Sequence, residues 1–352
     1  MTDWASNTSA TRIAQTLRSA APGRIVVITH SKPDGDAAGS AFALTRALRR
    51  AGVRAEVWFV GPLPAWMPNI QGDTPIRLFA GGKDCEPADG SPFDPGEEPA
   101  AIAVLDTGSW SQLAELRRYL EPRAGRAVLI DHHLHGDPET AAQRIIDPAA
   151  ASTTQLVAPV CVEVLGLSSA AHLPVEVAEP LYLGLATDTG WFRQSNTTAD
   201  ALRLAADLLA AGVVHTKLFA IIEQQGTVAR LRLLSRALAS LRIECGGKVA
   251  IMILRRDDFA ASGAERNDTT AFIDLPMTIP EVQVSVLVTE ERPPQDGTPV
   301  TKLSLRSKPG DHPVDVNELA GRLGGGGHAR AAGARCELPV EEAIARLLEA
   351  MR

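Results

Sequence analysis

The sequence has little of what marks several classes of protein. Of its 352 residues only 4% are aromatic, and its four cysteines, Cys85, Cys161, Cys245 and Cys336, show neither a CxxC pair nor close spacing. This argues against a disulfide scaffold or a thiolate metal site and favours a reducing compartment. We find no charged leader followed by a long apolar core, and no stretch that approaches a membrane span. We therefore expect a cytoplasmic protein with no membrane partner.

The sequence also lacks an excess of basic residues. Lys and Arg number 35 against 42 Asp and Glu, which gives a formal net charge of −7. A protein that binds long nucleic acids through their phosphates needs clustered Lys and Arg. The composition therefore argues against a broad phosphate-tracking surface. A short anionic ligand is still compatible with it, provided that metal ions or a local arginine supply positive charge.

The apolar residues, 45% of the chain, are arranged as in an α/β protein. Valine-, isoleucine- and leucine-rich runs, each followed by polar residues and a helical pattern, predict parallel strands with crossover helices. The predicted strands are Ile25–Thr29, Ala55–Val60, Ala101–Leu105, Ala127–Ile130 and Leu181–Ala186. The predicted helices are a first one with Ile13 and Leu17 facing inward, Ala37–Ala51, and Ala199–Ala211. The Pro-, Gly- and Asp-rich segment Pro87–Pro99 is expected to be a surface loop.

The pattern changes beyond the helical segment Thr227–Leu241. Three strand-like runs then precede a helical DVNELAGRL, a glycine run and an amphipathic last helix. They are Val249–Leu254, Gln283–Thr289 and Lys302–Arg306, followed by Gly324–Gly327 and Val340–Met351. The length suits two domains. We predict an α/β fold with an N-terminal parallel-sheet domain (1–212), a helical linker (213–241) and a smaller C-terminal α/β domain (242–352).

Four of the predicted strands of the first domain end in acids or histidines. These residues are His30, Asp34 and Asp36 after VVIT, Asp106 after AIAVL, Asp131, His132 and His133 after AVLI, and Asp188 after LYLGLAT. Open parallel sheets bind ligands beyond the carboxyl ends of their strands, so we expect these residues to converge on one crevice. The alternative is a set of unrelated helix caps and turn acids, because Asp is common in both.

So many carboxylates in one place require a cation, because unpaired buried charge is costly. Carboxylate and imidazole ligands without thiolate suit Mn²⁺, with Mg²⁺, Co²⁺ and Zn²⁺ as alternatives. The ligands exceed what one ion normally uses. We therefore predict two divalent ions about 3.5–4 Å apart, an arrangement that recurs in phosphoester hydrolysis.

Seven motifs of the sequence resemble those of a known family. HSKPDGDAAGS, AVLDTGS, LIDHHLHG and ATDTGWFRQSNTT resemble the four signature motifs of the DHH phosphoesterase superfamily. SLRS, DVNELA and GGGGHARAAGA resemble its DHH-associated C-terminal domain. Together they span nearly the whole chain in the family's order. The chain is most similar to the two-domain group of oligoribonucleases (nano-RNases) and pAp phosphatases, which includes enzymes that act on linear or cyclic dinucleotides.

The resemblance implies a role for each member of the acid and histidine cluster. The implied metal ligands are His30 and Asp34 for one ion, Asp36 and His132 for the other, Asp106 as the bridge, and Asp188. Asp131 is implied to orient a ligand histidine through its other ring nitrogen. His133 is implied to face the substrate, where it stabilises the phosphate or protonates the leaving oxygen.

The resemblance also implies substrate contacts outside the metal cluster. They are Arg193 and Asn196 in GWFRQSNTT, Ser152 and Thr153 in ASTTQ, Arg306 in SLRS, and Gly325, Gly326, Gly327 and His328 in GGGGH. Glycines let the backbone approach a ligand closely, although a glycine run is often a flexible link. Both arginines have the alternative of an ordinary surface position. The family pattern places an acid where Gln155 stands, so the role of Gln155 stays open.

The implied reaction is the hydrolysis of short oligonucleotides or dinucleotides to mononucleotides, or of pAp to AMP, by a bridging water that two metal ions activate. The second domain is implied to bind the nucleotide end of a short substrate across the cleft between the domains. Alternatives are a cyclic-dinucleotide phosphodiesterase, a RecJ-like single-strand exonuclease, an inorganic pyrophosphatase and a non-catalytic nucleotide sensor. An SRKK-like phosphate grip typical of the pyrophosphatases is absent. The sequence does not rank the substrates, and the resemblance implies a homodimer.

Overall fold

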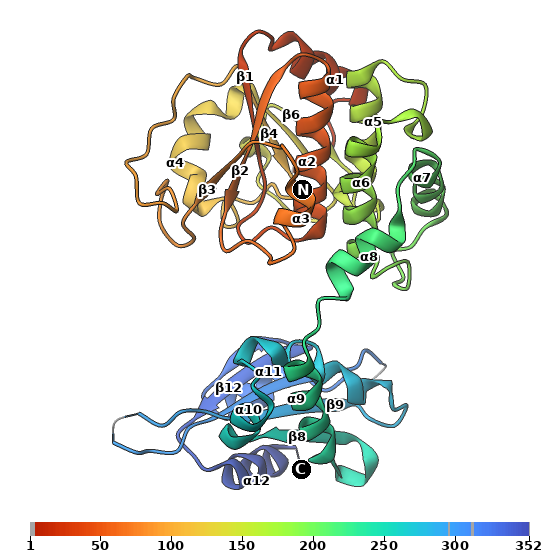
Figure 1. Ribbon diagram of the computed structural model, residues 1–352. Coiled ribbons are helices and arrows are strands. Elements are labelled where there is room, and N and C mark those ends of the chain that lie inside the picture. The colour runs from red at the N-terminus through yellow and green to blue at the C-terminus, as the bar shows by residue number, and fades with distance from the viewer. Residues whose placement is uncertain (1–3, 295, 311–312, 352) are drawn as a thin grey trace. The chain divides into compact units, whose positions relative to one another are not determined.

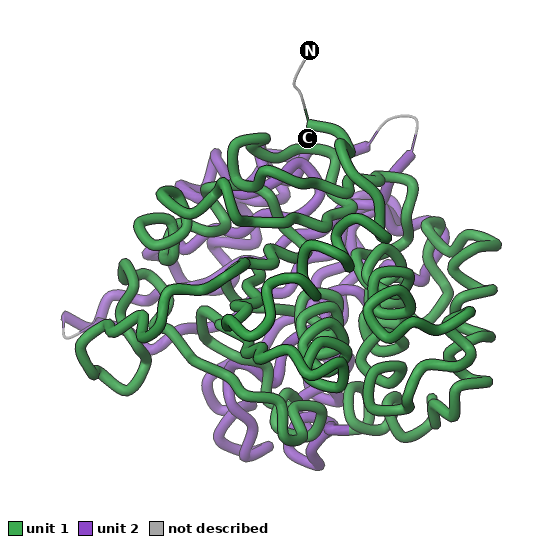
Figure 2. The backbone as a smooth tube through the Cα atoms, turned by 90° about the horizontal axis from the view of Figure 1, so that it is seen from above, with its two compact units in different colours: residues 1–224 green, residues 225–352 purple. Residues whose placement is uncertain are grey.

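The structure is a computed structural model that describes residues 4–294, 296–310 and 313–351. The chain divides into two compact units, Met1–Gln224 and Gln225–Arg352 (Figures 1 and 2). Each unit is built on one six-stranded sheet. The predicted linker, 213–241, holds two helices, α8 (His215–Glu223) and α9 (Val228–Ala239). Helix α8 contacts α6 in the first unit, and α9 contacts β8 in the second.

The first unit contains the predicted parallel sheet. Its strands are β1 (Arg24–Ile28), β2 (Arg54–Val60), β3 (Ile76–Phe79), β4 (Ala101–Leu105), β5 (Ala127–Asp131) and β6 (Gln143–Ile146). Their order is β3-β2-β1-β4-β5-β6, and all neighbouring pairs are parallel. Strands β2 and β3 are added on one side of β1, and β4, β5 and β6 are added on its other side, so the strand order changes direction between β1 and β4. Ligands of such sheets bind at this switch point, beyond the carboxyl ends of the strands.

Helices cover both faces of this sheet, which explains why its central strands are continuous apolar runs (Figure 1). The helices are α1 (Ala10–Ser19), α2 (Gly35–Arg50), α3 (Pro68–Gln71), α4 (Arg117–Leu120), α5 (Thr153–Leu165), α6 (Val175–Asp188) and α7 (Ala199–Ala210), besides α8. Short 3-10 turns lie at Ala114–Leu116, Glu121–Arg126, Pro138–Thr140 and Ala170–His172. Ile13 and Leu17 of α1 are fully buried, as predicted.

The predicted strand Leu181–Ala186 is wrong, because these residues belong to helix α6. All six are buried, so this part of the helix has no polar face from which the helical period could be recognised. Helix α6 packs closely against α2, and a Cβ added to Gly184 would lie 2.8 Å from Oδ1 of Asp36. This close approach brings the end of α6 to the carboxyl ends of the strands.

The second unit contains a mixed sheet. Its strands are β7 (Arg242–Glu244), β8 (Val249–Leu254), β9 (Val284–Glu290), β10 (Thr301–Ser307), β11 (Gly326–His328) and β12 (Ala331–Cys336), in the order β11-β12-β10-β9-β8-β7. Strands β8 and β9 are parallel and the other pairs are antiparallel. The three strands predicted from the sequence are β8, β9 and β10, so the predicted α/β class of the second unit is confirmed.

Two sets of helices cover the two faces of the second sheet. Helices α11 (Val316–Gly321) and α12 (Val340–Ala350) pack against Ile251, Val286 and Leu305. Helix α9 and the 3-10 segment Phe272–Thr278 pack against Met252 and Leu287 on the other face. The remaining elements are α10 (Arg256–Ser262) and 3-10 turns at Cys245–Gly247 and Arg266–Thr269.

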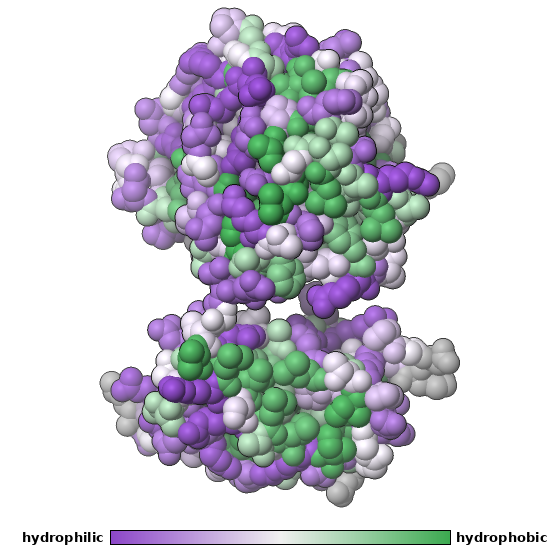
Figure 3. Space-filling view, turned by 45° about the vertical axis from the view of Figure 1, so that its right-hand side comes forward, coloured by the Kyte–Doolittle hydropathy of each residue, from purple (hydrophilic) through white to green (hydrophobic). Residues whose placement is uncertain are grey.

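Large apolar side chains are also exposed in both units, and Figure 3 shows hydrophobic residues gathered on the visible face of each. Examples are Leu202 on α7, which is 50% exposed, and Leu231 on α9, which is 60% exposed. Among the described residues, no single helix has both the length and the apolar composition needed to cross a membrane. Helices α7 and α8 pass that test of length and composition only as a pair, with a bend of 109° between them.

Candidate metal centre

The acids and histidines predicted from the four motifs meet at one place. His30, Asp106 and His132 follow β1, β4 and β5, which are neighbours in the sheet. Asp34 is the N-cap of α2, Asp36 lies in the first turn of that helix, and Asp188 is the last residue of α6. The ligand atoms fall into three overlapping groups, each within 4.8 Å: His30, Asp34 and Asp106; Asp36, His132 and Asp188; and Asp106, His132 and His133.

Asp106 lies at the centre of this cluster. Its Oδ2 is 3.5 Å from Nε2 of His30, and its Oδ1 is 3.7 Å from Nε2 of His132. The same His132 nitrogen is 3.7 Å from Oδ2 of Asp188. Two ligand atoms at about 2.1 Å from one ion lie about 3.0–3.5 Å apart, so these separations are close to those of atoms that share a cation. One carboxylate facing two histidines from different strands suits a bridging ligand.

The backbone has an unusual conformation at Asp106 and in the turn that follows Asp188. Asp106 has φ of 60°, which is left-handed, and its N–H donates to the carbonyl of Ile130 at 3.0 Å. Directly after Asp188, Gly190, Trp191 and Phe192 have φ of 55°, 58° and 63°. Residues other than glycine rarely adopt such angles, and where they do they are often at functional sites, because the conformation costs free energy.

The N-terminus of helix α5 holds two of the carboxylates. The N–H groups of Thr153 and Thr154 donate to Oδ2 and Oδ1 of Asp36 at 2.6 and 2.9 Å, and the hydroxyl of Thr153 donates to Oδ1 of Asp106 at 2.9 Å. Free N–H groups at a helix N-terminus favour negative charge. Ser152 and Thr153 are fully buried, and the hydroxyl of Thr153 is bonded to Asp106. Their contact with substrate stays a prediction.

The structure also gives Gln155 a role. Its Oε1 accepts a hydrogen bond from the N–H of Ala151 at 2.9 Å, and its own N–H donates to the hydroxyl of Ser152 at 3.3 Å. The arrangement is similar to a capping box, except that the side chain of the third helical residue accepts from the residue before the N-cap and not from the N-cap itself. Gln155 therefore stabilises the start of α5, the helix end that supports Asp36 and Asp106.

The three histidines are oriented by three different partners. Nδ1 of His30 lies 2.9 Å from the carbonyl oxygen of Ser31, and Nδ1 of His132 lies 3.3 Å from that of Ala150. Each contact leaves Nε2 directed to the cluster, which is how neighbouring groups fix the orientation of a ligand imidazole. Neither partner was identified from the sequence, because a backbone carbonyl leaves no motif.

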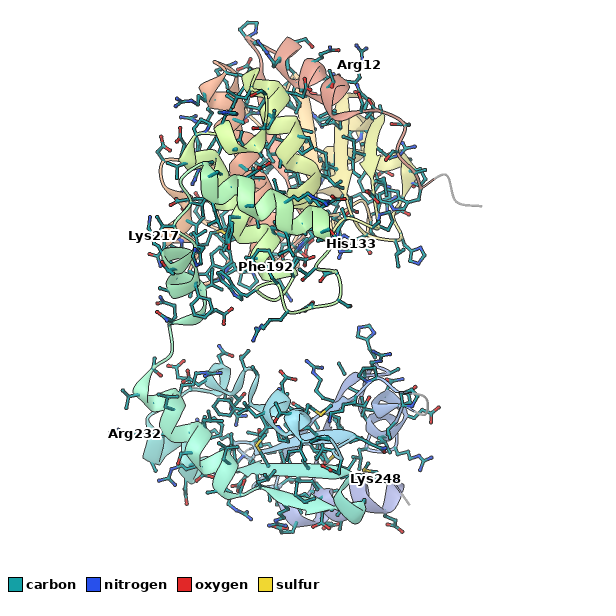
Figure 4. All side chains as sticks on the ribbon, turned by 90° about the vertical axis from the view of Figure 1, so that its right-hand side faces the viewer. Arg12, His133, Phe192, Lys217, Arg232 and Lys248 are labelled. Atoms are coloured by element: carbon teal, nitrogen blue, oxygen red, sulfur yellow. The ribbon has the colours of Figure 1, made fainter. Side chains whose placement is uncertain are left out.

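Asp131 orients one histidine of the cluster. Its Oδ1 lies 2.6 Å from Nδ1 of His133, so His133 is the histidine that it holds. Asp131 is fully buried, while the His133 side chain, labelled in Figure 4, is 45% exposed. Among the described residues Nε2 of His133 has no hydrogen-bond partner, so that nitrogen is available to a ligand.

Burial and mutual repulsion disfavour the charged forms of the carboxylates in this cluster. Burial, with the charges of Asp106 and Asp188, raises the pKa of Asp36 well above its ordinary value, and burial also raises the pKa of Asp188. Burial opposes the charged imidazole of His30, but the hydrogen bond and charge of Asp106 outweigh it and raise its pKa to about 9. No Lys or Arg pairs with these carboxylates in the described part of the chain. Divalent cations therefore fit the donor set.

The two predicted substrate contacts near Asp188 differ in their surroundings. Arg193 is exposed, and its Nε donates to the carbonyl of Gly190 at 2.8 Å. The Nδ2 of Asn196 donates to the carbonyls of Ala151 and Asp188, each at 3.1 Å. Asn196 therefore ties the end of α6 to the start of α5. Its Oδ1 is buried and has no partner among the described residues.

In the second unit, Arg306 and Gly326 line one pocket of about 370 Å³. The other lining residues are Thr269, Thr270, Ala271, Ile273, Leu287, Ser304, Leu305, Ala331, Ala332 and Gly333. Arg306 pairs with Ala331, which pairs with His328, so these three side chains lie on one face of the sheet. No sequence motif marks Thr269–Ala271, which lie far from the glycine motif along the chain.

The predicted glycines divide into two kinds. A Cβ at Gly325 would lie 2.5 Å from Cα of Ala334, and one at Gly327, where φ is 153°, would lie 2.5 Å from the carbonyl oxygen of Ala331. These two glycines are required by the pairing of β11 with β12. A Cβ at Gly326 would meet just one atom within 4 Å, Oδ1 of Asn317 at 3.7 Å. The glycine run is therefore a structured strand entry, and Gly326 keeps the pocket open.

Comparison with known families agrees with the motifs. The sequence matches the DHH family, N-terminal domain, over residues 24–185 and the DHHA1 domain over residues 246–352. A curated relative from Thermus thermophilus, named bifunctional oligoribonuclease and PAP phosphatase NrnA, is 33% identical over 341 residues, which are 97% of this chain and 92% of the relative. A relative of the same name from Bacillus subtilis is 25% identical over 311 residues, 88% of each chain.

The fold also has a solved counterpart. The crystal structure of an exopolyphosphatase-related protein from Bacteroides fragilis matches with a TM-score of 0.76 and 23% identity, and the match covers 100% of this chain and 97% of that one. At this identity the match concerns the fold alone. Three observations point to the same family. They are the sequence matches, the parallel sheet with acids and histidines at its carboxyl end, and the second sheet. The chain belongs to the DHH family, with a DHHA1 domain following its DHH domain.

Proposed function

We propose that this protein is a metal-dependent phosphoesterase that hydrolyses short oligoribonucleotides to mononucleotides and the bisphosphonucleotide pAp to AMP. The observation that carries the proposal is the position of Asp106, whose two oxygens face His30 and His132 from neighbouring strands. The names of the relatives from Thermus thermophilus and Bacillus subtilis support the choice of substrates.

The metal ligands would be the residues that meet at the strand ends. His30 and Asp34 would hold one ion, Asp36 and His132 the other, Asp106 both, and Asp188 completes the set. Mn²⁺ suits this mixture of carboxylate and imidazole, with Mg²⁺ and Co²⁺ as alternatives. When bound, two divalent ions supply the Lewis acidity that makes water a nucleophile near neutral pH.

The residues around the ligands would bind and orient the phosphate. Nδ1 of His133 is held by Asp131, and the hydrogen bond with Asp131 raises the pKa of His133 above its ordinary value. The ring therefore favours its charged form, which can donate from Nε2 to a phosphate oxygen or to the leaving oxygen. Arg193 is exposed near the end of α6 and can pair with a second phosphate oxygen.

The second unit would bind the rest of the substrate. The pocket beside Arg306 has a charged side chain at one point, and most of its other strand residues are Gly, Ala and Ser, with Leu287 and Leu305 adding apolar surface, which leaves room for a flat ligand. We propose that Arg306 binds a terminal phosphate while Gly326, with the neighbouring Gly325, Gly327 and His328, brings the backbone close to the nucleotide. A pocket of about 370 Å³ holds one nucleotide better than a long strand.

The compartment and assembly are also proposals. Cys85, Cys161, Cys245 and Cys336 are all free, which supports a reducing cytoplasm. The homodimer implied by the resemblance stays a prediction, and sedimentation equilibrium tests it.

The proposal is tested by a substrate panel. The protein is incubated with Mn²⁺ and, separately, a 5′-phosphorylated diribonucleotide, pAp, a cyclic dinucleotide, pyrophosphate and a long single strand. We expect release of mononucleotide from the diribonucleotide and of phosphate from pAp, and an increased KM in Arg306→Ala. The matched control is Lys302→Ala, which changes an exposed cation of the same strand outside the pocket. Rapid hydrolysis of pyrophosphate with no cleavage of the diribonucleotide would contradict the proposal.

A further inference from the structure

Trp4 lies against the two loops that carry Asp106 and His133. Its indole Nε1 donates a hydrogen bond to the carbonyl oxygen of His133 at 3.0 Å. A Cβ at Gly108 would lie 2.7 Å from Cζ3 of the Trp4 ring, and one at Gly136 would lie 2.5 Å from Cζ2. For both glycines the three nearest atoms belong to Trp4. The ring therefore occupies the space that a side chain at either position would fill.

The segment that carries Trp4 is fixed independently of these loops. Ser6 accepts a hydrogen bond from the N–H of Ile146 at 2.7 Å and donates to its carbonyl at 2.8 Å. The N–H of Asn7 donates to the carbonyl of Arg144 at 3.0 Å, and its side chain accepts from the N–H of Arg144 at 2.7 Å. These bonds attach the segment to the edge of strand β6. Trp4 is thus held by one part of the sheet while it contacts another.

The two loops under Trp4 are joined to each other. The N–H of Asp137 donates to the carbonyl of Gly108 at 2.8 Å, and its carboxylate accepts from the N–H of Trp110 at 2.8 Å. The loop after β5 is therefore bonded directly to the loop after β4. His133 is held in this loop at its ring and N–H by Asp131 and at its carbonyl by Trp4.

We propose that Trp4 is a positioning residue for His133. It acts through the main chain of His133 and through the packed surface of Gly108 and Gly136. Active-site groups need neighbours that lock their orientation, because a small displacement lowers the rate considerably. The inference rests on the proposed function in one respect, namely that His133 contacts the substrate phosphate.

The first test compares Trp4→Ala with the parent in the full chain. Hydrogen exchange of peptides covering 132–137 reports the order of the loop, and peptides covering 24–28 of the central strand β1 serve as the internal reference. We expect faster exchange in 132–137, unchanged exchange in β1, unchanged Mn²⁺ binding, and a kcat for the diribonucleotide about 10-fold lower with little change in KM. Trp4→Phe keeps an aromatic ring and loses the N–H donor. Its exchange rate in 132–137 and its kcat are expected to lie between those of Trp4→Ala and the parent.

The second test displaces the Trp4 ring by a substitution in the loop that it contacts. Gly136→Ala adds a methyl group where the ring lies, so it should reproduce the exchange and the kcat of Trp4→Ala. The double variant, Trp4→Ala with Gly136→Ala, should have a kcat no lower than that of either single variant, because the ring that the methyl group displaces is already absent. Gly125→Ala is the control, since a Cβ there meets nothing within 4 Å.

The outcomes separate this inference from the proposed function. An inactive parent protein would contradict the proposed function, and the exchange comparison would still test the positioning. Unchanged exchange at 132–137 in Trp4→Ala would overturn the inference. So would faster exchange with an unchanged kcat, or losses in kcat from Trp4→Ala and Gly136→Ala that multiply in the double variant.

Discussion

The two candidate sites of this molecule are built in opposite ways. In the first unit Asp36 and Asp106 are 1% and 2% exposed, and hydrogen bonds from helix α5 hold both carboxylates. In the second unit Arg306 and His328 are exposed, and the pocket exists because Gly and Ala leave space. Hydrogen bonds hold the residues of the first site in place, whereas the second site is open because its glycines and alanines have little or no side chain. Substitutions should therefore affect turnover and metal binding in the first unit, and KM in the second.

The largest expected effect comes from Asp106→Asn, which keeps the size of the side chain and removes the charge that faces His30 and His132. Metal-ion stabilisation of a phosphoryl transition state is worth several kcal/mol, so we expect kcat/KM to fall about 10³-fold or more. The measurement is steady-state hydrolysis of the diribonucleotide at saturating Mn²⁺. Activity within about 10-fold of the parent would show that the centre does not depend on Asp106.

The metal-free protein should lose stability as the pH rises. The folded-state pKa of His30 is about 9, above its ordinary value of 6.5, so its contribution is present below pH 6.5 and is lost as the pH rises to about 9. The raised pKa values of Asp36 and Asp188 also lower the stability as the pH rises, starting from their ordinary value of 3.8. We expect the free energy of unfolding in urea with EDTA to fall by about 3 kcal/mol or less between pH 6.5 and 9.

Two controls sharpen this prediction. Asp106→Asn removes the partner of His30 and should flatten the pH dependence. Saturating Mn²⁺ should reverse it, because metal binding needs deprotonated ligands and becomes tighter as the pH rises. Equal stability of the metal-free parent at both pH values would contradict the electrostatic account of the cluster.

Adjacent threonines give a smaller and more selective effect. Thr153→Val removes the hydroxyl that donates to Asp106 and keeps the shape and the N–H bond to Asp36. Loss of such a supporting bond typically costs about 10–100-fold in metal affinity or activity, and we expect a loss in this range. Thr154→Val is the matched control, because its buried hydroxyl bonds Ser152 and no metal ligand. Similar losses in both variants would mean that general packing, and not the bond to Asp106, is responsible.

Adjacent glycines test the second unit. Gly325→Ala places a methyl group against β12 and should lower the melting temperature by several degrees, through overpacking of about 1–3 kcal/mol. Gly326→Ala has room and should leave the melting temperature unchanged, but it narrows the pocket beside Arg306, and we expect KM to rise about 10-fold. Thermal melts and steady-state kinetics separate the two. An unchanged KM in Gly326→Ala would show that the substrate does not bind in this pocket.

Much of this fold follows from the sequence because its strands are buried on both faces. Strands β1, β4 and β5 contain the apolar runs Ile25–Ile28, Ala101–Leu105 and Ala127–Ile130, and acids or histidines of the cluster follow each run within two residues, so the sequence predicts both the strands and their carboxyl ends. The same property makes the prediction wrong at Leu181–Ala186, because a helical segment buried on all sides shows the same short apolar run as a buried strand. Asp188 reaches the cluster from a helix, yet its place in the cluster was still predicted.

The direction of individual side chains could not be predicted. Ser152 and Thr153 are small and polar, and composition alone does not tell whether such groups face the substrate or the ligands. Asp131 stands beside two histidines in the sequence, and only the geometry of the loop shows that it bonds the second. Trp4 has no motif at all, because its partners, Gly108 and Gly136, are more than a hundred residues away and contribute no side chain.

The central claim is that the strand ends form a two-ion centre bridged by Asp106. It is tested most directly by titrating the metal-free protein with Mn²⁺ and counting bound ions by calorimetry and electron paramagnetic resonance. The account predicts two ions per chain in the parent, with spins coupled through their shared ligand, and loss of the coupling and of at least one ion in Asp106→Asn. A parent that binds one ion or none, or an Asp106→Asn protein that binds two coupled ions like the parent, would contradict it.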